Sequence, residues 1–140
     1  MIYFDYEDVS DLQLDTDLII KWINRVVDQH KGICKEISFL FCSDEYILKM
    51  NRAYLNHDYY TDIITFDYCE DRFISGDILI SLDTVRSNAN TYNTSFDEEL
   101  HRVIIHGILH LLGFKDKTAE EDAAMHALED EALQLLKTIS

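Results

Sequence analysis

The sequence predicts an α+β or mixed α/β protein in which four strands come first and helices dominate the C-terminal half. Four segments before residue 83 are rich in strand-forming residues, and five segments carry apolar residues at helical spacing. Their order along the chain is β-α-β-α-β-β-α-α-α. Such an arrangement is typical of a sheet covered by helices.

The first strand and helix are predicted from alternation and from a cap. Ile2, Phe4 and Tyr6 alternate with Tyr3 and Asp5, which predicts a strand over residues 2–6. Asp15 or Thr16 can cap a helix, and Gly32 is expected to stop it. The apolar stripe of that helix comprises Leu18, Ile19, Trp22, Ile23, Val26 and Val27.

Three further strands and two helices fill the middle of the chain. Residues 36–42, 62–68 and 75–82 are predicted as strands because strand-forming residues dominate them. Ser43 or Asp44 is expected to cap the helix after the first of these, and Asp83 or Thr84 the helix that runs toward Tyr92. The inward residues of the earlier helix are predicted to be Tyr46, Ile47, Met50 and Tyr54.

The two last helices each start with a capping-box pattern. Ser95 is followed by Glu98, and Thr118 is followed by Glu121, so each pair has the Ser/Thr-x-x-Glu spacing that satisfies free backbone N–H groups. The final helix is expected to bury Met125, Leu128, Ala132, Leu135 and Leu136.

Length and composition indicate one domain over residues 1–140. The chain is 47% hydrophobic, lacks proline and has four glycines, so it is dense in regular structure without a flexible linker. It has no apolar run of eighteen residues, and its first residues do not resemble a signal peptide. A cytoplasmic protein is therefore expected, and its three cysteines, which form no CxxC pair, are expected to remain free thiols.

The formal net charge of −15 argues against an extended basic surface that binds nucleic acid phosphates, although it leaves room for a local basic groove. Acidic residues gather in two segments, which are expected to be solvated faces. They are Asp5, Glu7, Asp8, Asp11, Asp15 and Asp17 near the N-terminus, and Glu120, Glu121, Asp122, Glu129, Asp130 and Glu131 in the last helix.

Two histidines lie four residues apart in the most apolar helix of the chain. His106 and His110 share a helix face, and that spacing suits two imidazoles on one metal ion. A metal would also satisfy two polar rings on an otherwise apolar helix. Gly107 is unfavourable inside a helix by about 1 kcal/mol relative to alanine. Either a bound group approaches its backbone closely or a second helix packs there.

A third ligand must come from beyond this helix. Gly113 is expected to end it, and Asp116 then lies within reach of the same point. The HExxH pattern of metalloproteases is missing because Gly107 takes the place of the glutamate, so peptide hydrolysis of that type is not expected. The set indicates a metal-dependent hydrolase, for which no general base is assigned.

The motif His-Gly-x-Leu-His-Leu-x-Gly-aromatic over residues 106–114 resembles that of the YbeY family of bacterial endoribonucleases. Two other segments resemble this family too, namely residues 51–66 (NRAYLNHDYYTDIITF) and 76–81 (GDILIS). The resemblance implies a zincin-like α+β fold with a small mixed four-stranded sheet, about five helices and one Zn²⁺ per chain. It implies a single-strand-specific endoribonuclease in maturation of the small-subunit rRNA 3′ end and in ribosome quality control. The implied partners are ribosomal RNA, the small ribosomal subunit and its proteins.

The chain departs from the family pattern at three positions. Asp116 stands where the pattern has a third histidine, so His106 and His110 carry over as metal ligands directly and Asp116 by position. Leu55 occupies the place of an arginine that serves the phosphate, with Arg52 one turn earlier. Tyr60 replaces a proline.

Several charged side chains are candidates for contact with substrate. Lys115 and Lys117 flank Asp116 and either neutralise RNA phosphates or are solvated, and Arg52 is a third candidate. Asp62 and Asp77 either support the ligands or contact substrate, or they are turn and cap residues at strand ends. His101 is expected to be off the ligand face, at the surface or in a cap. No role is expected for His30, His57 and His126.

Three ligands leave one zinc position for water, whose pKa then falls to about 7. Two other functions stay open. One is a non-catalytic ribosome-associated factor whose metal site is structural or weakened, which Leu55 and Asp116 favour. The other is a metal hydrolase of small molecules, which the acidity favours.

Overall fold

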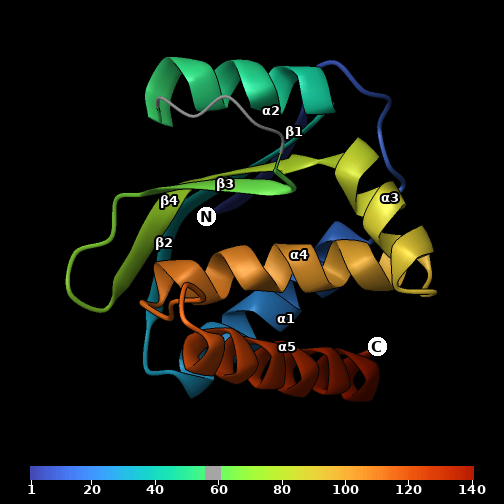
Figure 1. The fold of residues 1–140 in the computed structure, drawn as a ribbon. Coiled ribbons are helices and arrows are strands. Elements are labelled where there is room, and N and C mark those ends of the chain that lie inside the picture. The colour runs from blue at the N-terminus through green and yellow to red at the C-terminus, as the bar shows by residue number, and fades with distance from the viewer. Residues whose placement is uncertain (56–60) are drawn as a thin grey trace.

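A computed structural model describes residues 1–55 and 61–140. It confirms the predicted order of strands and helices and a mixed α+β architecture (Figure 1). The elements are β1 (Ile2–Tyr6), α1 (Thr16–Gln29), β2 (Ile33–Cys42), α2 (Asp44–Met50), the π-helical turn η1 (Asn51–Leu55), β3 (Ile63–Asp67), β4 (Phe73–Ser81), α3 (Leu82–Thr91), α4 (Phe96–Leu111) and α5 (Ala119–Ile139).

The four strands form one mixed sheet in the order β1-β2-β4-β3. β1 and β4 both run parallel to β2, whereas β3 pairs antiparallel with β4. Phe39 of β2 is opposite Phe4 on one side and Ile78 on the other, so apolar side chains line up across the strands. This alignment gives the sheet a continuous apolar face.

Helices cover both faces of the sheet (Figure 1). α1 and α4 pack on the face that carries Phe39 and Ile78, and α5 lies behind them. α2 covers the other face, where a smaller cluster contains Cys42, Ile47, Ile64 and Leu79. The indole Nε1 of Trp22 donates to the carbonyl of Ala132 at 2.7 Å, which ties α1 to α5. In the described ranges, no helix has the length and apolarity needed to cross a membrane.

Gly107 allows α4 to lie close to the sheet. A Cβ at this position would be 3.0 Å from side-chain carbons of both Ile63 and Ile78. The expected helix–helix contact at Gly107 is therefore wrong, because the close neighbours are strands β3 and β4. A glycine here lets the helix that carries the two histidines lie close to β3 and β4.

Several element boundaries differ from the predictions. β2 starts at Ile33, before the predicted residue 36, because its pairing with β4 continues across a register shift between Cys34 and Ile37. α1 ends at Gln29, and Lys31 takes the left-handed conformation (φ 63°) before Gly32 is reached. Ser81 caps α3 by accepting from the Thr84 N–H at 3.3 Å, so Asp83 and Thr84 lie inside the helix. Asp15 and Ser43 cap α1 and α2 as predicted.

The two capping boxes have different outcomes. At α5, Thr118 and Glu121 form both reciprocal hydrogen bonds, as predicted. At α4, Ser95 accepts from the Glu98 N–H, but the Glu98 carboxylate accepts from the Thr94 hydroxyl at 2.7 Å. The predicted hydrogen bond from the Ser95 backbone N–H to the Glu98 carboxylate was therefore wrong, because the Thr94 hydroxyl competes for that carboxylate.

Candidate metal centre

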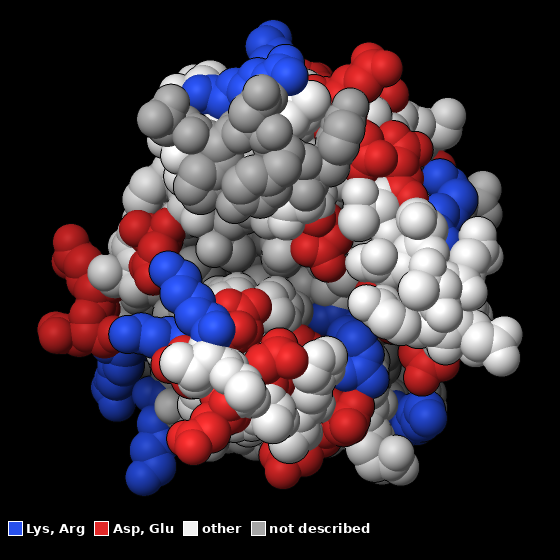
Figure 2. Space-filling view, viewed as in Figure 1, with Lys and Arg blue, Asp and Glu red and all other residues white. Residues whose placement is uncertain are grey.

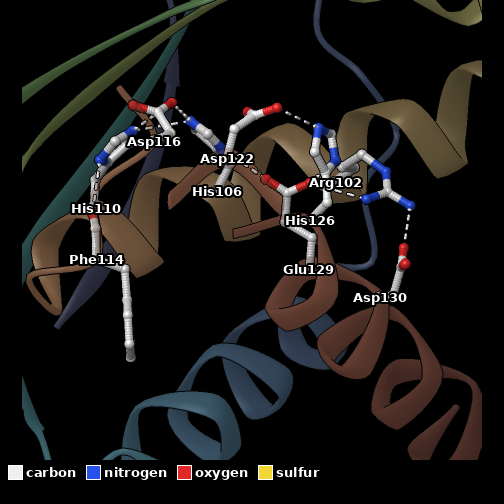
Figure 3. Close-up of polar contacts among 9 residues, drawn as sticks. All are labelled: Arg102, His106, His110, Phe114, Asp116, Asp122, His126, Glu129 and Asp130. Carbon is white, nitrogen blue, oxygen red and sulfur yellow. Dashed lines mark hydrogen bonds and ion pairs between the residues drawn. The ribbon is translucent and has the colours of Figure 1, made fainter. Parts of the chain in front are cut away.

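The two histidines of α4 and Asp116 converge on one point (Figure 3). The Nε2 atoms of His106 and His110 are 2.9 Å apart, and Asp116 Oδ2 lies 3.2 Å and 3.4 Å from them. The chain returns to the helix because Gly113 takes a φ of +101° just after α4, a conformation that favours glycine. All three groups are partly exposed, so the centre opens to the surface.

The far side of each imidazole is held by an acceptor. His110 Nδ1 donates to the Phe114 carbonyl at 3.1 Å, and His106 Nδ1 donates to Glu129 Oε2 at 2.6 Å. With Nδ1 protonated in both neutral rings, both Nε2 lone pairs point into the same space. Two lone pairs and a carboxylate at this separation repel one another unless a proton or a metal ion lies between them. The donor set therefore fits a divalent metal that accepts nitrogen and oxygen ligands, such as zinc.

Glu129 is the residue that the sequence interpretation placed wrongly. It was expected on a solvated acidic face, yet it is only 2% exposed. Its carboxylate also accepts from Arg102 Nη1 at 2.9 Å, and Arg102 Nη2 donates to Asp130 at 2.7 Å. Burial acts to raise the pKa of Glu129, but hydrogen bonds from His106 and Arg102 outweigh it and lower the pKa. Glu129 is therefore ionised beside His106.

The burial of Glu129 could have been predicted from its position in the apolar stripe of α5. Met125, Glu129, Ala132 and Leu136 are all buried and are spaced by four, three and four residues. A carboxylate within an apolar stripe needs a partner. The acidic composition of the surrounding segment concealed this pattern.

A cavity of about 500 Å³ adjoins His106 along the outer side of α4. It is bounded by α3, α4 and α5, and Asp62 lies in its wall. Burial raises the pKa of both Asp62 and Glu99, against the opposing effects of His106 and Arg102 respectively. Figure 2 shows acidic side chains gathered around the hollow on this face of the molecule.

The other candidate residues lie outside the group of His106, His110 and Asp116. Lys115 and Lys117 are exposed on either side of Asp116, and Arg52 and Leu55 are exposed on η1. Asp77 accepts from the Tyr68 hydroxyl at 3.3 Å, away from the histidines. Their contact with a substrate stays a prediction. Tyr60 and His57 lie outside the described residues.

The other described histidines each contact an aromatic ring or a carboxylate. His101 lies off the ligand face as predicted, but it packs edge-on against the Trp22 ring, with 5.9 Å between centroids, and burial lowers its pKa. A surface or capping role for it was wrong, because α1 covers that side of α4. His126 lies 3.4 Å from Glu129 and lines the cavity, and His30 packs edge-on against Phe114.

Comparisons with known proteins decide the family. The model of the family described as "Endoribonuclease YbeY" matches residues 5–137. The chain belongs to the YbeY family. Its relatives named "Endoribonuclease YbeY" include that of Porphyromonas gingivalis, which is 54% identical over 97% of this chain and 90% of its own. The YbeY protein of Phocaeicola vulgatus is 52% identical over 97% of this chain and 99% of its own.

The YbeY fold is also visible in a solved structure. The solution structure of TM1509 from Thermotoga maritima is 26% identical to this chain, with a TM-score of 0.68. The match covers 97% of this chain and 89% of TM1509. The α+β fold that the resemblance implies is thus confirmed.

Proposed function

We propose that this chain is a zinc-dependent endoribonuclease that cleaves single-stranded RNA during ribosome assembly. The observation that carries the proposal is the convergence of His106, His110 and Asp116 on one point in a member of the YbeY family. Its substrate is ribosomal RNA at the 3′ end of the small-subunit RNA, and it takes part in ribosome quality control. Its partners are the small ribosomal subunit and associated proteins.

The chain's own groups have distinct parts in this proposal. His106 and His110 hold the metal through Nε2, and Asp116 holds it through its carboxylate. When bound, zinc supplies a Lewis acid that polarises a phosphoryl oxygen and lowers the pKa of water. Glu129 and the Phe114 carbonyl orient the two imidazoles through Nδ1.

Phosphate recognition is assigned to three exposed cations, two of which flank Asp116. Lys115 and Lys117 flank Asp116 and are exposed, so they can reach RNA phosphates beside the metal. Arg52 takes the part of the arginine that Leu55 replaces in the family pattern. These three side chains form the local basic contact that an otherwise acidic protein needs.

A second function is favoured by the same departures. Leu55 removes a cation, and Asp116 changes the charge of the centre, which would both weaken catalysis. The chain would then be a non-catalytic ribosome-associated factor with a structural or weakened metal site.

Metal content and RNA cleavage together test the two functions. Untagged protein purified without chelators is analysed by elemental mass spectrometry, and cleavage of single-stranded RNA is measured with chelator and after zinc is restored. His106→Gln is the test variant, and His101→Gln, on the same helix but off the ligand face, is its control. We expect near-stoichiometric zinc and chelator-sensitive cleavage, both lost in His106→Gln and kept in His101→Gln.

The outcomes separate the alternatives. Bound zinc without cleavage supports the non-catalytic factor. Cleavage that survives both chelation and His106→Gln contradicts the proposed metal centre.

A further inference from the structure

The cavity beside His106 continues directly from the candidate metal centre. His106 belongs to both, and Glu129, Arg102 and Glu99 extend the lining along α4 and α5 away from the ligands. Figure 3 shows the row from Asp116 and His110 through His106 to Arg102 and Asp130. A strand held at the metal by a phosphate would therefore have this cavity next to it.

Glu99 is a buried carboxylate without a hydrogen-bonding partner. It is 5% exposed and lines the cavity, and it makes no hydrogen bond or ion pair with the residues that the structure describes. In the same ranges, no completely buried side-chain oxygen or nitrogen lacks a partner. The carboxylate oxygens therefore reach the cavity, and an N–H donor from a ligand can satisfy them.

The charges of the lining decide between ligand classes. Arg102 is the cationic side chain in the described wall, and it is already paired with Glu129 and Asp130. The acidic groups of the lining, which come from α4, α5 and the residue before β3, repel phosphate. They are Asp62, Glu98, Glu99, Asp122, Glu129 and Asp130.

A second metal ion is not favoured either. Within residues 1–55 and 61–140, the group of three converging ligands is the one at His106, His110 and Asp116. The cavity therefore suits an uncharged organic group with N–H donors. Tyr92 lines the same cavity and is 67% exposed, so its ring offers a stacking surface to a planar group.

We propose that this cavity binds a nucleobase bearing an exocyclic amino group, with the amino group donating to Glu99 and the base stacking on Tyr92. The inference rests on the proposed function, because the base belongs to the RNA strand at the metal centre. Carboxylates accept from the cytosine N4 amino group, whereas uracil has a carbonyl oxygen at that position. The cavity would thus prefer cytosine to uracil.

Two octamers test the proposal, one made of cytosine nucleotides with N4 amino groups and one made of uracil nucleotides with O4 carbonyl groups. Fluorescence anisotropy measures the affinity of the zinc-loaded protein for 2′-O-methyl C8 and U8, which resist cleavage, at one fixed salt concentration. We expect C8 to bind about tenfold more tightly, within the range that one specific base contact provides. Glu99→Gln should reduce that ratio to within about twofold. Glu131→Gln, the same change at an exposed residue of α5 outside the cavity, should leave it unchanged.

Three results overturn this base site. They are equal affinity for C8 and U8, a preference that persists in Glu99→Gln, and no binding of either octamer. Cleavage of ordinary RNA is measured in parallel. If the protein cleaves RNA but shows one of these results, the base site fails and the proposed function stands. If it also fails to cleave RNA, both fail.

Discussion

In the proposed metal centre, Asp116 would be a negative ligand beside two neutral imidazoles. A divalent ion with three histidines keeps a net charge of +2, whereas two histidines and one carboxylate leave +1. The lower charge makes zinc less effective at lowering the pKa of water and makes the site more tolerant of harder metals such as manganese.

This charge difference predicts a shift in pH dependence. The acid limb of the pH–rate profile should lie at higher pH in the natural protein than in Asp116→His, because the histidine variant has the more positive centre. Profiles of RNA cleavage, measured on zinc-loaded samples of both proteins, provide the test. Coincident limbs, or a limb at higher pH in the variant, would refute the charge argument.

Glu129 should set the metal affinity through His106. Glu129→Gln removes the charge that holds His106 Nδ1 and Arg102, and we expect zinc to bind about 10–100-fold more weakly. Competition with a chromogenic chelator measures the affinity without an activity assay. Asp130→Asn, which touches Arg102 but not His106, is the matched control. Equal affinity of Glu129→Gln and the natural protein would contradict the role.

The convergence of the three candidate ligands was predictable from the sequence, whereas the groups that hold their imidazoles were not. His106 and His110 follow from helical spacing, and Asp116 from a glycine turn. Glu129 is thirteen residues beyond Asp116 and reaches His106 only because α5 packs along α4. That packing depends on nonlocal contacts such as Trp22 with Ala132, which no local pattern reports.

At the scale of elements, close contacts between β3, β4 and α4 fix the position of the helix that carries His106 and His110. A Cβ at Gly76 of β4 would lie 2.5 Å from the Phe66 carbonyl oxygen and 3.0 Å from a Leu111 side-chain carbon. Backbone cannot yield at that distance without separating the two strands.

Gly76→Ala should therefore destabilise the fold. We expect the free energy of unfolding to fall by about 1–3 kcal/mol, the usual cost of overpacking. Urea unfolding followed by circular dichroism measures the change. Ala53→Gly, at an exposed position of η1, shows the size of a change in backbone freedom alone. An unchanged urea midpoint in Gly76→Ala would contradict this prediction, because it would mean that β3 and β4 move apart at no cost in stability.

The elements themselves were largely predictable, because alternation, apolar stripes and caps are local signals. Their pairing was not. β4 lies between β2 and β3, so β2 pairs with a strand more than thirty residues later in the chain. The start of β2 at Ile33 also depends on that partner, since the Ile33 N–H donates to the Arg72 carbonyl.

Over the whole molecule, the charge of −15 restricts RNA contact to a few cations. If Arg52, Lys115 and Lys117 neutralise three phosphates of a single strand, the logarithm of RNA affinity should fall with the logarithm of salt concentration with a slope of about −2.

Removing two of these cations tests how many of them contact RNA phosphates. Lys115→Ala combined with Lys117→Ala should bring the slope to about −0.7. Lys137→Ala, near the C-terminal end of α5, should leave it near −2. Equal slopes in the natural protein and the double variant would exclude the two lysines from the RNA contact.

The three candidate ligands span residues 106–116, a stretch of eleven residues that needs no distant strand to bring them together. An unfolded chain can therefore offer the same two imidazoles and carboxylate to zinc. Binding to the unfolded state cancels part of the stabilisation that a ligand gives to the native state. Zinc should accordingly raise the melting temperature by less than its affinity for the folded protein suggests. The difference reflects the Glu129 contact, which exists only after α5 has docked.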